Sequence, residues 1–252
     1  VPDHNEFSMC AVAALEALDE AGMKLRDVDA VFTNYMGEEG SVQLSEYLGL
    51  QPRFAESSDH GGASFEYFVH HAMLAIATGR CETALITYAS RQRSRKGRKR
   101  AVSAEDQSLP AQFEAPFGIH FPIGHYALSA ARHMHQYGTT PEHLAHVALA
   151  ARAWARKNPK AWSRDPLTLD EVMASPLISD PLRKADCCLV TDGGGAVIVT
   201  SAARARDARK QAIRVIGAGE SQVQWQVAQC PDLTVTPGAA SGRAAFAMAG
   251  IK

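Results

Sequence analysis

The segment that decides the fold is SSDHGGASFEYFVHHAMLAIATGRCETALITYAS, which runs from Ser57 to Ser90. It predicts a polar turn, a two-glycine bend, an amphipathic helix over residues 64–78 that ends at Gly79, and the buried strand TALITYA. The start of a helix favours negative charge, so a bend of this kind normally presents a reactive side chain or holds an anion. Here the bend supplies Gly61, Gly62, Ala63 and Ser64. The sequence therefore raises the question of whether a nucleophile is missing.

The residues before this segment alternate between helices and buried strands. Residues 8–21 predict a helix with Ser8 as its N-cap and Gly22 at its end. The strand VDAVFTN (28–34), the short helix SVQLSEYLG and an extended piece around Phe54 follow. Helices that alternate with buried strands at this spacing indicate an α/β fold whose sheet is mostly parallel and carries helices on both faces.

The middle of the chain has a different character. Residues 91–100, RQRSRKGRKR, hold seven basic residues in ten. Two helices follow: the first has an alanine-rich stripe over residues 127–134, and the second begins at Thr140 and Pro141 with its stripe over 144–155. Strands return at GGAVIVTS and AIRVIGAGES. We therefore predict an N-terminal α/β half over residues 1–90, a helical insertion over 91–185, a return to that half over 186–239, and the start of a second half over 240–252.

The end of the chain repeats a pattern from its beginning. ASGRAAFAMAGIK (240–252) resembles CAVAALEALDEAGMK (10–24), since both have an alanine-rich helix followed by Ala-Gly, an apolar residue and Lys. The repeat predicts a duplicated unit whose second copy is cut at its first helix, so that most of a second half is absent from this chain. A coincidence between two alanine-rich helices is the alternative.

Composition argues against several kinds of partner. The formal net charge of the 252 residues is −1, which gives no general attraction for nucleic acid or for an anionic membrane. No apolar run approaches the roughly 20 residues that span a bilayer, and the N-terminus lacks the features of a signal peptide. We therefore expect a cytoplasmic protein. The five cysteines form no CxxC pair, which favours reduced core thiols over zinc ligands.

Three motifs carry a resemblance to a known family. They are GGASF with the helix after it, the helical segment YGTTPEHLA…NPKA, and DPLRKADCCLVTDGGGAVIV at the return strand. Together they resemble the thiolase superfamily, and within it the sterol-carrier-protein-type thiolases and the lipid-transfer-protein-like steroid side-chain aldolases. The resemblance covers nearly the whole chain. It implies two similar halves in a five-layered αβαβα core, a loop domain inserted in the first half, and a homodimer.

In that family an acylated cysteine stands at the start of the helix that follows a short strand. The resemblance puts Gly62 at this position, with Ala63 and Ser64 matching the next two residues. Gly has no side chain to acylate, and Cys81 lies beyond the far end of the helix, roughly 25 Å away at about 1.5 Å per residue. The resemblance thus implies that Gly61, Gly62 and Ala63 form an oxyanion- or thioester-binding bend without a nucleophile. The alternative is a pair of glycines that serves only a tight turn.

Other residues near the bend are candidates for contact with a substrate. Ser64 is a candidate nucleophile, and a helix cap is the alternative. His60 is a candidate catalytic or substrate-contacting group, and a solvated loop histidine is the alternative. Tyr88 ends a strand at the edge where ligands gather in such sheets, although an aromatic residue there is also ordinary packing. The resemblance implies that His125 lies in a region that approaches the pantetheine arm.

The basic run and the histidines suggest two further kinds of site. Arg91, Arg93 and Arg95 are candidates to pair with coenzyme A phosphates, and a solvated loop is the alternative. A nucleic-acid role is not favoured, since no aromatic residues alternate with the arginines. The other histidines lack a carboxylate or cysteine that would complete a ligand set, so we expect no bound metal.

The resemblance implies an enzyme that makes or breaks a C–C bond beside an acyl-CoA thioester. Without the cysteine we predict a non-covalent retro-aldol cleavage of a bulky steroid or aromatic β-hydroxyacyl-CoA, with a base from the absent half. Coenzyme A enters only as part of the substrate, and no separate cofactor is expected. Similar aldolases need a small zinc-ribbon/OB-fold partner protein, which the resemblance implies here as well. The alternatives are a non-catalytic acyl-CoA or sterol binding or lipid-transfer protein, and an ordinary acetyl-CoA acyltransferase whose cysteine lies elsewhere.

Overall fold

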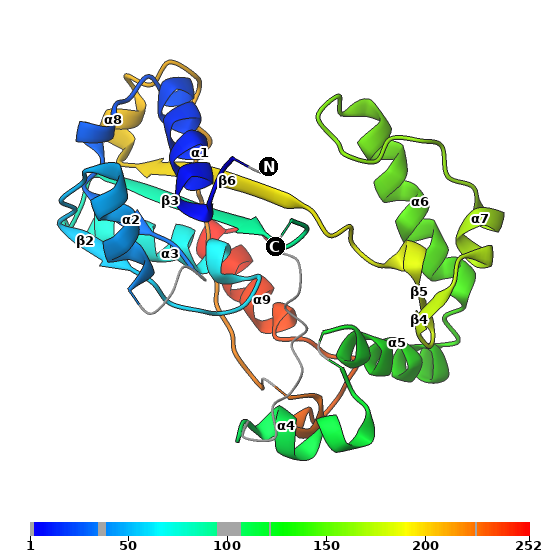
Figure 1. Ribbon diagram of the computed structural model, residues 1–252. Coiled ribbons are helices and arrows are strands. Elements are labelled where there is room, and N and C mark those ends of the chain that lie inside the picture. Colours follow the sequence, from blue (N-terminus) through cyan, green and yellow to red (C-terminus); the bar gives the residue numbers. More distant parts are fainter. Residues whose placement is uncertain (1–2, 35–38, 95–106, 121, 225) are drawn as a thin grey trace. The chain divides into compact units, whose positions relative to one another are not determined.

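The computed structural model describes residues 3–34, 39–94, 107–120, 122–224 and 226–252. These residues form two compact units, each of which is considered by itself. The first unit contains the chain up to residue 98 together with residues 190–220 and 240–252. The second unit contains residues 99–189 and 221–239. Figure 1 shows the elements of both units along the chain.

A four-stranded sheet organises the first unit, in the order β2 (Phe54–Glu56), β1 (Ala30–Phe32), β3 (Thr83–Arg91), β6 (Asp192–Thr200). The strand β1 pairs in parallel with both β2 and β3, as the sequence predicts. The strand β6 runs antiparallel to β3 over its whole length, from Thr83 opposite Thr200 to Arg91 opposite Asp192. The sheet is therefore mixed, and β6 is its antiparallel edge strand.

Helices cover both faces of this sheet (Figure 1). The helices α1 (Glu6–Ala21) and α2 (Gly40–Leu48) share one core with Val31 and Leu85. The helix α3 (Ser64–Ala77) shares the other core with Phe32 and Ile86. Because side chains alternate between the two faces of a strand, neighbouring residues of β1 and β3 supply opposite cores. The α/β fold predicted from the alternating pattern is thus confirmed.

The start of α1 differs from the prediction. Its N-cap is Asn5, whose side chain accepts a hydrogen bond from the Ser8 N–H at 2.8 Å. Ser8 stands three residues inside the helix and completes a capping box by accepting from the Asn5 N–H at 3.0 Å. Ser8 as N-cap was therefore wrong: both residue types cap well, and only the reciprocal pair of bonds identifies the first one. The predicted end at Gly22 is confirmed, with φ at +76°.

The second unit is mainly helical. Its main elements are α5 (Ile123–Tyr137) and α6 (Pro141–Lys157), with the predicted Thr140 as the N-cap of α6. The smaller elements are α4 (Leu109–Phe113), η2 (Ala115–Phe117), α7 (Leu169–Ala174), the hairpin β4 (Leu177–Ser179) and β5 (Leu182–Arg183), η3 (Lys184–Asp186) and η4 (Val227–Gln229).

The remaining elements of the chain are η1 (Leu25–Asp27), α8 (Ala202–Ala205) and α9 (Gly238–Ala249). The strand predicted at AIRVIGAGES (212–221) does not form. This segment pairs with no strand among the described residues. This segment packs on α9 instead. A Cβ atom on Gly217 or Gly219 would overlap the carbonyl oxygens of Ala245 and Ser241, so the two glycines permit a close approach of backbone to helix.

A test of the α3 core compares two residues of the same helix. Phe68 is fully buried and Leu74 is 51% exposed. Phe68→Ala is expected to lower the free energy of unfolding by about 3–5 kcal/mol, since it leaves a cavity between helix and sheet. Leu74→Ala is expected to change it by no more than about 0.5 kcal/mol. Urea unfolding followed by circular dichroism measures both, and equal losses would contradict this packing.

Candidate active site

The candidate site is the bend that joins β2 to α3. It lies at the carboxyl end of β2, where the chain turns back into the helix, and Asn34 at the end of β1 lies beside it. Gly61 has φ at +64°, in the left-handed region that favours glycine. Gly62 has an ordinary φ, and apart from Gly62 and its two chain neighbours no described residue has an atom within 4 Å of the point where a Cβ would stand. Backbone conformation thus requires glycine at Gly61 but not at Gly62.

The hydroxyl of Ser64 holds the bend together. Its oxygen accepts hydrogen bonds from the His60 N–H at 2.8 Å and from the Asn34 side-chain amide at 2.6 Å. It also donates to the carbonyl oxygen of Gly61 at 2.8 Å. Ser64 is fully buried and Asn34 is almost fully buried. The carboxylate of Asp59 adds a further brace by accepting from the Gly61 N–H at 2.9 Å.

The alternative interpretation expected Ser64 to cap α3, and the structure shows that it does not. The N-cap is Ala63, and Ser64 is the first helical residue. Its side chain points back into the bend because the Gly61 carbonyl and the His60 N–H lie there. The hydroxyl proton is directed at the Gly61 carbonyl, and a nucleophilic role for Ser64 stays a prediction.

His60 lies on the side of the bend that faces α3. It is half-buried, and its ring stacks on Tyr67 with 4.4 Å between ring centres and 19° between planes. Tyr67 in turn meets His71 edge-on at 6.2 Å. The predicted site residue His60 is therefore fixed by an aromatic contact to the helix that follows the bend, and its role toward a substrate stays a prediction.

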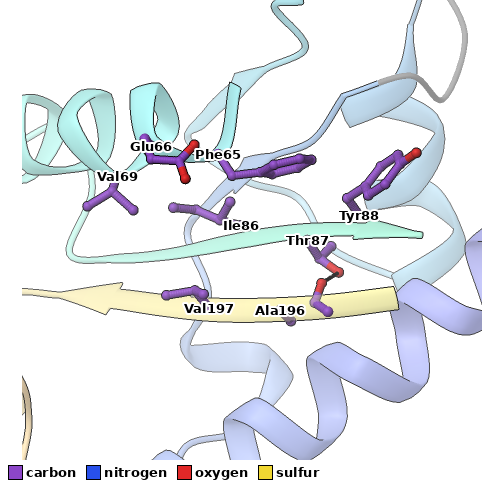
Figure 2. A pocket seen from close by; sticks show the side chains of 9 residues that line it. Phe65, Glu66, Val69, Ile86, Thr87, Tyr88, Ala196 and Val197 are labelled. Carbon is purple, nitrogen blue, oxygen red and sulfur yellow. Dashed lines mark hydrogen bonds between the residues drawn. The ribbon is translucent and has the colours of Figure 1, made fainter. Parts of the chain in front are cut away.

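Tyr88 lines an apolar cavity of about 420 Å³ beside α3. Figure 2 shows that the lining comes from three elements: Phe65, Glu66 and Val69 of α3; Ile86, Thr87 and Tyr88 of β3; and Ala196 and Val197 of β6. The Tyr88 ring contacts Phe65 at 5.2 Å between ring centres. Thr87 donates its hydroxyl to the Gly195 carbonyl, so the lining is mostly hydrocarbon. Tyr88 is thereby brought next to the residue that follows Ser64.

The predicted phosphate contacts have their own partners. Arg91 donates to the carbonyl oxygen of His4 at 2.6 Å. The N–H groups of Arg93 and Ser94 donate to Asp192, and chiefly the Ser94 N–H lowers the pKa of that carboxyl to about 2. Arg95 lies outside the described residues. The start of the basic run is thus attached to Asp192, at the beginning of β6.

His125 belongs to the second unit, where its ring nitrogen Nε2 lies 2.7 Å from the carboxylate of Glu114. Glu114 is almost fully buried and also accepts from the Ala228 N–H at 3.2 Å. Glu114 thus connects the start of α5 to η4. Nothing in the sequence pattern singled out Glu114, since a lone glutamate in a polar segment normally lies on the surface.

Three features of the bend were missed by sequence reasoning: Asn34, Glu56 and His71. Asn34 sits at the end of a buried strand, where a buried polar residue signals a hydrogen-bonding task. Glu56 at the end of β2 lies 2.9 Å from the Nδ1 atom of His71 in α3. That pair is 15 residues apart in the chain, so no local spacing rule predicts it.

No described cysteine stands at the bend. Burial raises the pKa of the Cys10 thiol to about 11, and burial likewise raises the pKa of Cys81. Both side chains are buried, whereas Cys188 is exposed. No group of three or more His, Cys, Asp or Glu side chains that could hold a metal ion is found within the described part of the chain. Among the same residues, no helix is long and apolar enough to cross a membrane.

The fold and the bend define an α/β protein of the thiolase type, and comparisons with known proteins agree. The chain is 33% identical over 223 residues to 17-hydroxy-3-oxo-4-pregnene-20-carboxyl-CoA lyase of Mycobacterium tuberculosis, covering 86% of this chain and 58% of that relative. It is 34% identical over 210 residues to steroid side-chain-cleaving aldolase of Thermomonospora curvata, covering 81% of this chain and 54% of that relative. No protein-family model matches the chain.

A solved structure, the Ltp2-ChsH2(DUF35) aldolase, aligns with a TM-score of 0.87 at 30% identity, covering 99% of this chain and 66% of that one. The chain belongs to the thiolase superfamily, in the subgroup of sterol-carrier-protein-type thiolases and lipid-transfer-protein-like aldolases. The resemblance derived from the motifs is thereby confirmed. The chain spans little more than half the length of the two curated relatives.

The two glycines of the bend give a test of its backbone. Gly61→Ala is expected to lower the free energy of unfolding by about 1–2 kcal/mol, since its φ of +64° is strained for any L side chain. Gly62→Ala is expected to change it by no more than about 0.5 kcal/mol, since the space is open. Urea unfolding of the two single variants provides the comparison. A larger loss at Gly62 than at Gly61 would overturn the geometry.

Thiol labelling tests the alternative in which a reactive cysteine lies elsewhere. A pKa near 11 keeps Cys10 in its unreactive thiol form at neutral pH. We expect a thiol-reactive acyl-CoA analogue to label Cys188 in the native protein, and to label Cys10 and Cys81 only after denaturation. Peptide mass spectrometry identifies the sites. Rapid native labelling of Cys10 or Cys81 would restore the acyltransferase alternative.

Proposed function

We propose that this chain takes part in non-covalent retro-aldol cleavage of a bulky β-hydroxyacyl-CoA, with the bend of Gly61, Gly62 and Ala63 as the site that holds the thioester oxygen. The observation that carries this proposal is the combination at Gly62: a helix start, open space around the position of a Cβ atom, and no side chain to acylate. The electrostatic part of thiolase chemistry is retained there, and the covalent part is absent.

The chemistry balances without a covalent intermediate. A base removes the proton from the β-hydroxyl group, the Cα–Cβ bond breaks, and its electron pair moves into the thioester as an enolate. The products are a ketone and, after protonation of the α-carbon, a shorter acyl-CoA. The N–H groups at the start of α3 would stabilise the enolate oxygen, because its negative charge is larger than that of the ground-state carbonyl. Since the Ser64 hydroxyl is bonded within the bend, we look for the base outside it.

The substrate class and the partners follow from the relatives. One relative is named as a lyase of a steroid carboxyl-CoA and another as a steroid side-chain-cleaving aldolase, which supports a bulky polycyclic acyl group here. The aligned solved structure joins Ltp2 to a DUF35 protein, which supports a small partner protein. The homodimer, the cytoplasmic location, and contact of Arg91, Arg93 and Arg95 with coenzyme A phosphates remain parts of the same proposal.

The proposal is tested with a steroid β-hydroxyacyl-CoA, in the presence and absence of a DUF35-type partner. We expect the ketone and the shortened acyl-CoA to appear in equal amounts, with no acyl adduct on the protein by intact mass spectrometry. Transfer of an acyl group to free coenzyme A through a covalent adduct would overturn it. Tight binding of the acyl-CoA without any turnover would favour the binding-protein alternative.

A variant pair links turnover to the bend. Gly62→Leu places a bulky side chain over the N–H groups that hold the enolate, and we expect turnover to fall at least about 100-fold, as for loss of an oxyanion donor. Gly242→Leu on α9 is the matched control, since that glycine also has open space around its Cβ position. Equal turnover in the two variants would exclude the bend as the oxyanion site.

A further inference from the structure

A cluster of two histidines and two glutamates lies on the side of α3 next to the bend. We call Glu56, His70, His71 and Glu220 the His71 cluster. The Nδ1 atom of His71 lies 2.9 Å from each carboxylate oxygen of Glu56, and its Nε2 atom lies 3.3 Å from Glu220. His70 lies 2.6 Å from the same Glu220 oxygen. The side chains of all four are between 17% and 29% exposed, so water screens these contacts only in part.

The contacts of His71 define its charge. A neutral imidazole carries one N–H group, and an ionised carboxylate accepts hydrogen bonds but cannot donate them. His71 has a carboxylate oxygen beside each of its two ring nitrogens. Only the doubly protonated imidazolium form satisfies both contacts with ionised carboxylates. His71 therefore lies where an imidazolium ring would direct one N–H group at Glu56 of β2 and the other at Glu220 of the segment that packs on α9.

The cluster is connected to the bend by two routes. Along the backbone, Glu56 is the last residue of β2, and its carboxylate also contacts the Ser58 hydroxyl at the start of the bend. Along the rings, His71 meets Tyr67 edge-on, and Tyr67 stacks on His60 within the bend. A change in the position of Glu56 or of the His71 ring therefore reaches Ser58 and His60, the two contacts on the N-terminal side of Gly61 and Gly62.

We propose that protonated His71 is a positioning residue for the bend, and that loss of its proton loosens the bend. At low pH the imidazolium holds Glu56 and Glu220 together across α3. As the pH rises through the histidine range, between about 5 and 8, the second N–H is lost and one contact becomes a repulsion between lone pairs. The consequence for turnover rests on the proposed function, whereas the consequence for the geometry of the bend does not.

The groups that face His71 come from every element packed around it. Glu56 faces His71 from β2, and Glu220 faces it from the segment that packs on α9. Tyr67 and His70 face it from α3 itself. A cavity of about 240 Å³ is lined by Glu56 and His71, and also by Arg80, which follows the end of α3. The two carboxylates lie within 3.3 Å of the imidazole ring, and His70 is the basic side chain that contacts it among the described residues.

The backbone amides of Gly61 and Gly62 report the state of the bend directly. Two-dimensional ¹H–¹⁵N spectra of the full chain from pH 5 to 8 should show both glycine resonances moving with the same midpoint as the His71 ring protons. His71→Gln removes the charge and should abolish this transition. His71→Arg keeps a permanent cation and should also abolish it, with the glycine amides fixed near their low-pH positions.

His70→Gln is the matched control, since His70 contacts Glu220 but has no recorded contact with Glu56. In this variant the glycine transition should persist. If the wild-type glycine amides do not titrate with His71, or if His70→Gln abolishes the transition and His71→Gln does not, the proposal is overturned. The wild-type titration alone decides the question if a variant fails to fold.

Turnover supplies a second, separable readout. With an active preparation, His71→Gln should lower kcat about 10- to 100-fold at pH 6 and leave KM nearly unchanged, because a misplaced oxyanion site weakens transition-state binding. His71→Arg should restore most of the rate and remove the decline toward pH 8. Absence of any turnover would contradict the proposed function, and the glycine titration would still decide the role of His71.

Discussion

The hydroxyl group of Ser64 is the interaction on which the bend depends. It joins the end of β1 through Asn34, the inside of the bend through His60 and Gly61, and the first turn of α3 through its own backbone. All of these groups are buried or partly buried, so each bond removes a polar group that would otherwise be costly to desolvate. Gly61 is in the left-handed conformation, and its carbonyl oxygen accepts the hydrogen bond from the Ser64 hydroxyl where the chain enters the helix.

If Gly62 holds the position of the thiolase cysteine, as we propose, this architecture explains how the bend keeps its shape without that side chain. None of the bracing bonds uses a side chain at Gly62, and the space above Gly62 is open. The sulfur position of a thiolase is therefore independent of what holds the bend in shape. A helix start that stabilises negative charge and a neighbouring apolar cavity remain when the side chain is reduced to hydrogen. The same frame thus suits chemistry that needs oxyanion stabilisation alone.

The sequence predicted what is periodic or local, and it missed what depends on contacts between distant residues. The α3 helix, the buried strand after it and the helical pair α5 and α6 follow from apolar spacing, caps and glycine stops. The strand expected over residues 212–220 failed because a strand pattern forms a strand only beside a partner. The Ser64 cap failed because its hydroxyl oxygen accepts from the His60 N–H and the Asn34 amide inside the bend instead of from an N–H of the helix. Glu114 and the contact between Glu56 and His71 have no local signature, so only the folded chain reveals them.

In the positioning role that we propose for His71, a protonated ring would act on the bend through geometry more than through its electric field. Seven residues separate Ser64 from His71 on α3, which is about 10 Å along the helix axis. A lone unit charge at that distance would act on an anion with roughly 0.4–1.7 kcal/mol for effective dielectric constants between about 80 and 20. Glu56 and Glu220 lie within 3.3 Å of the imidazole ring, and their two negative charges more than cancel the single positive charge of that ring. What remains is the mechanical link from Glu56 to Ser58 and from Tyr67 to His60, which determines where the N–H groups of the bend point.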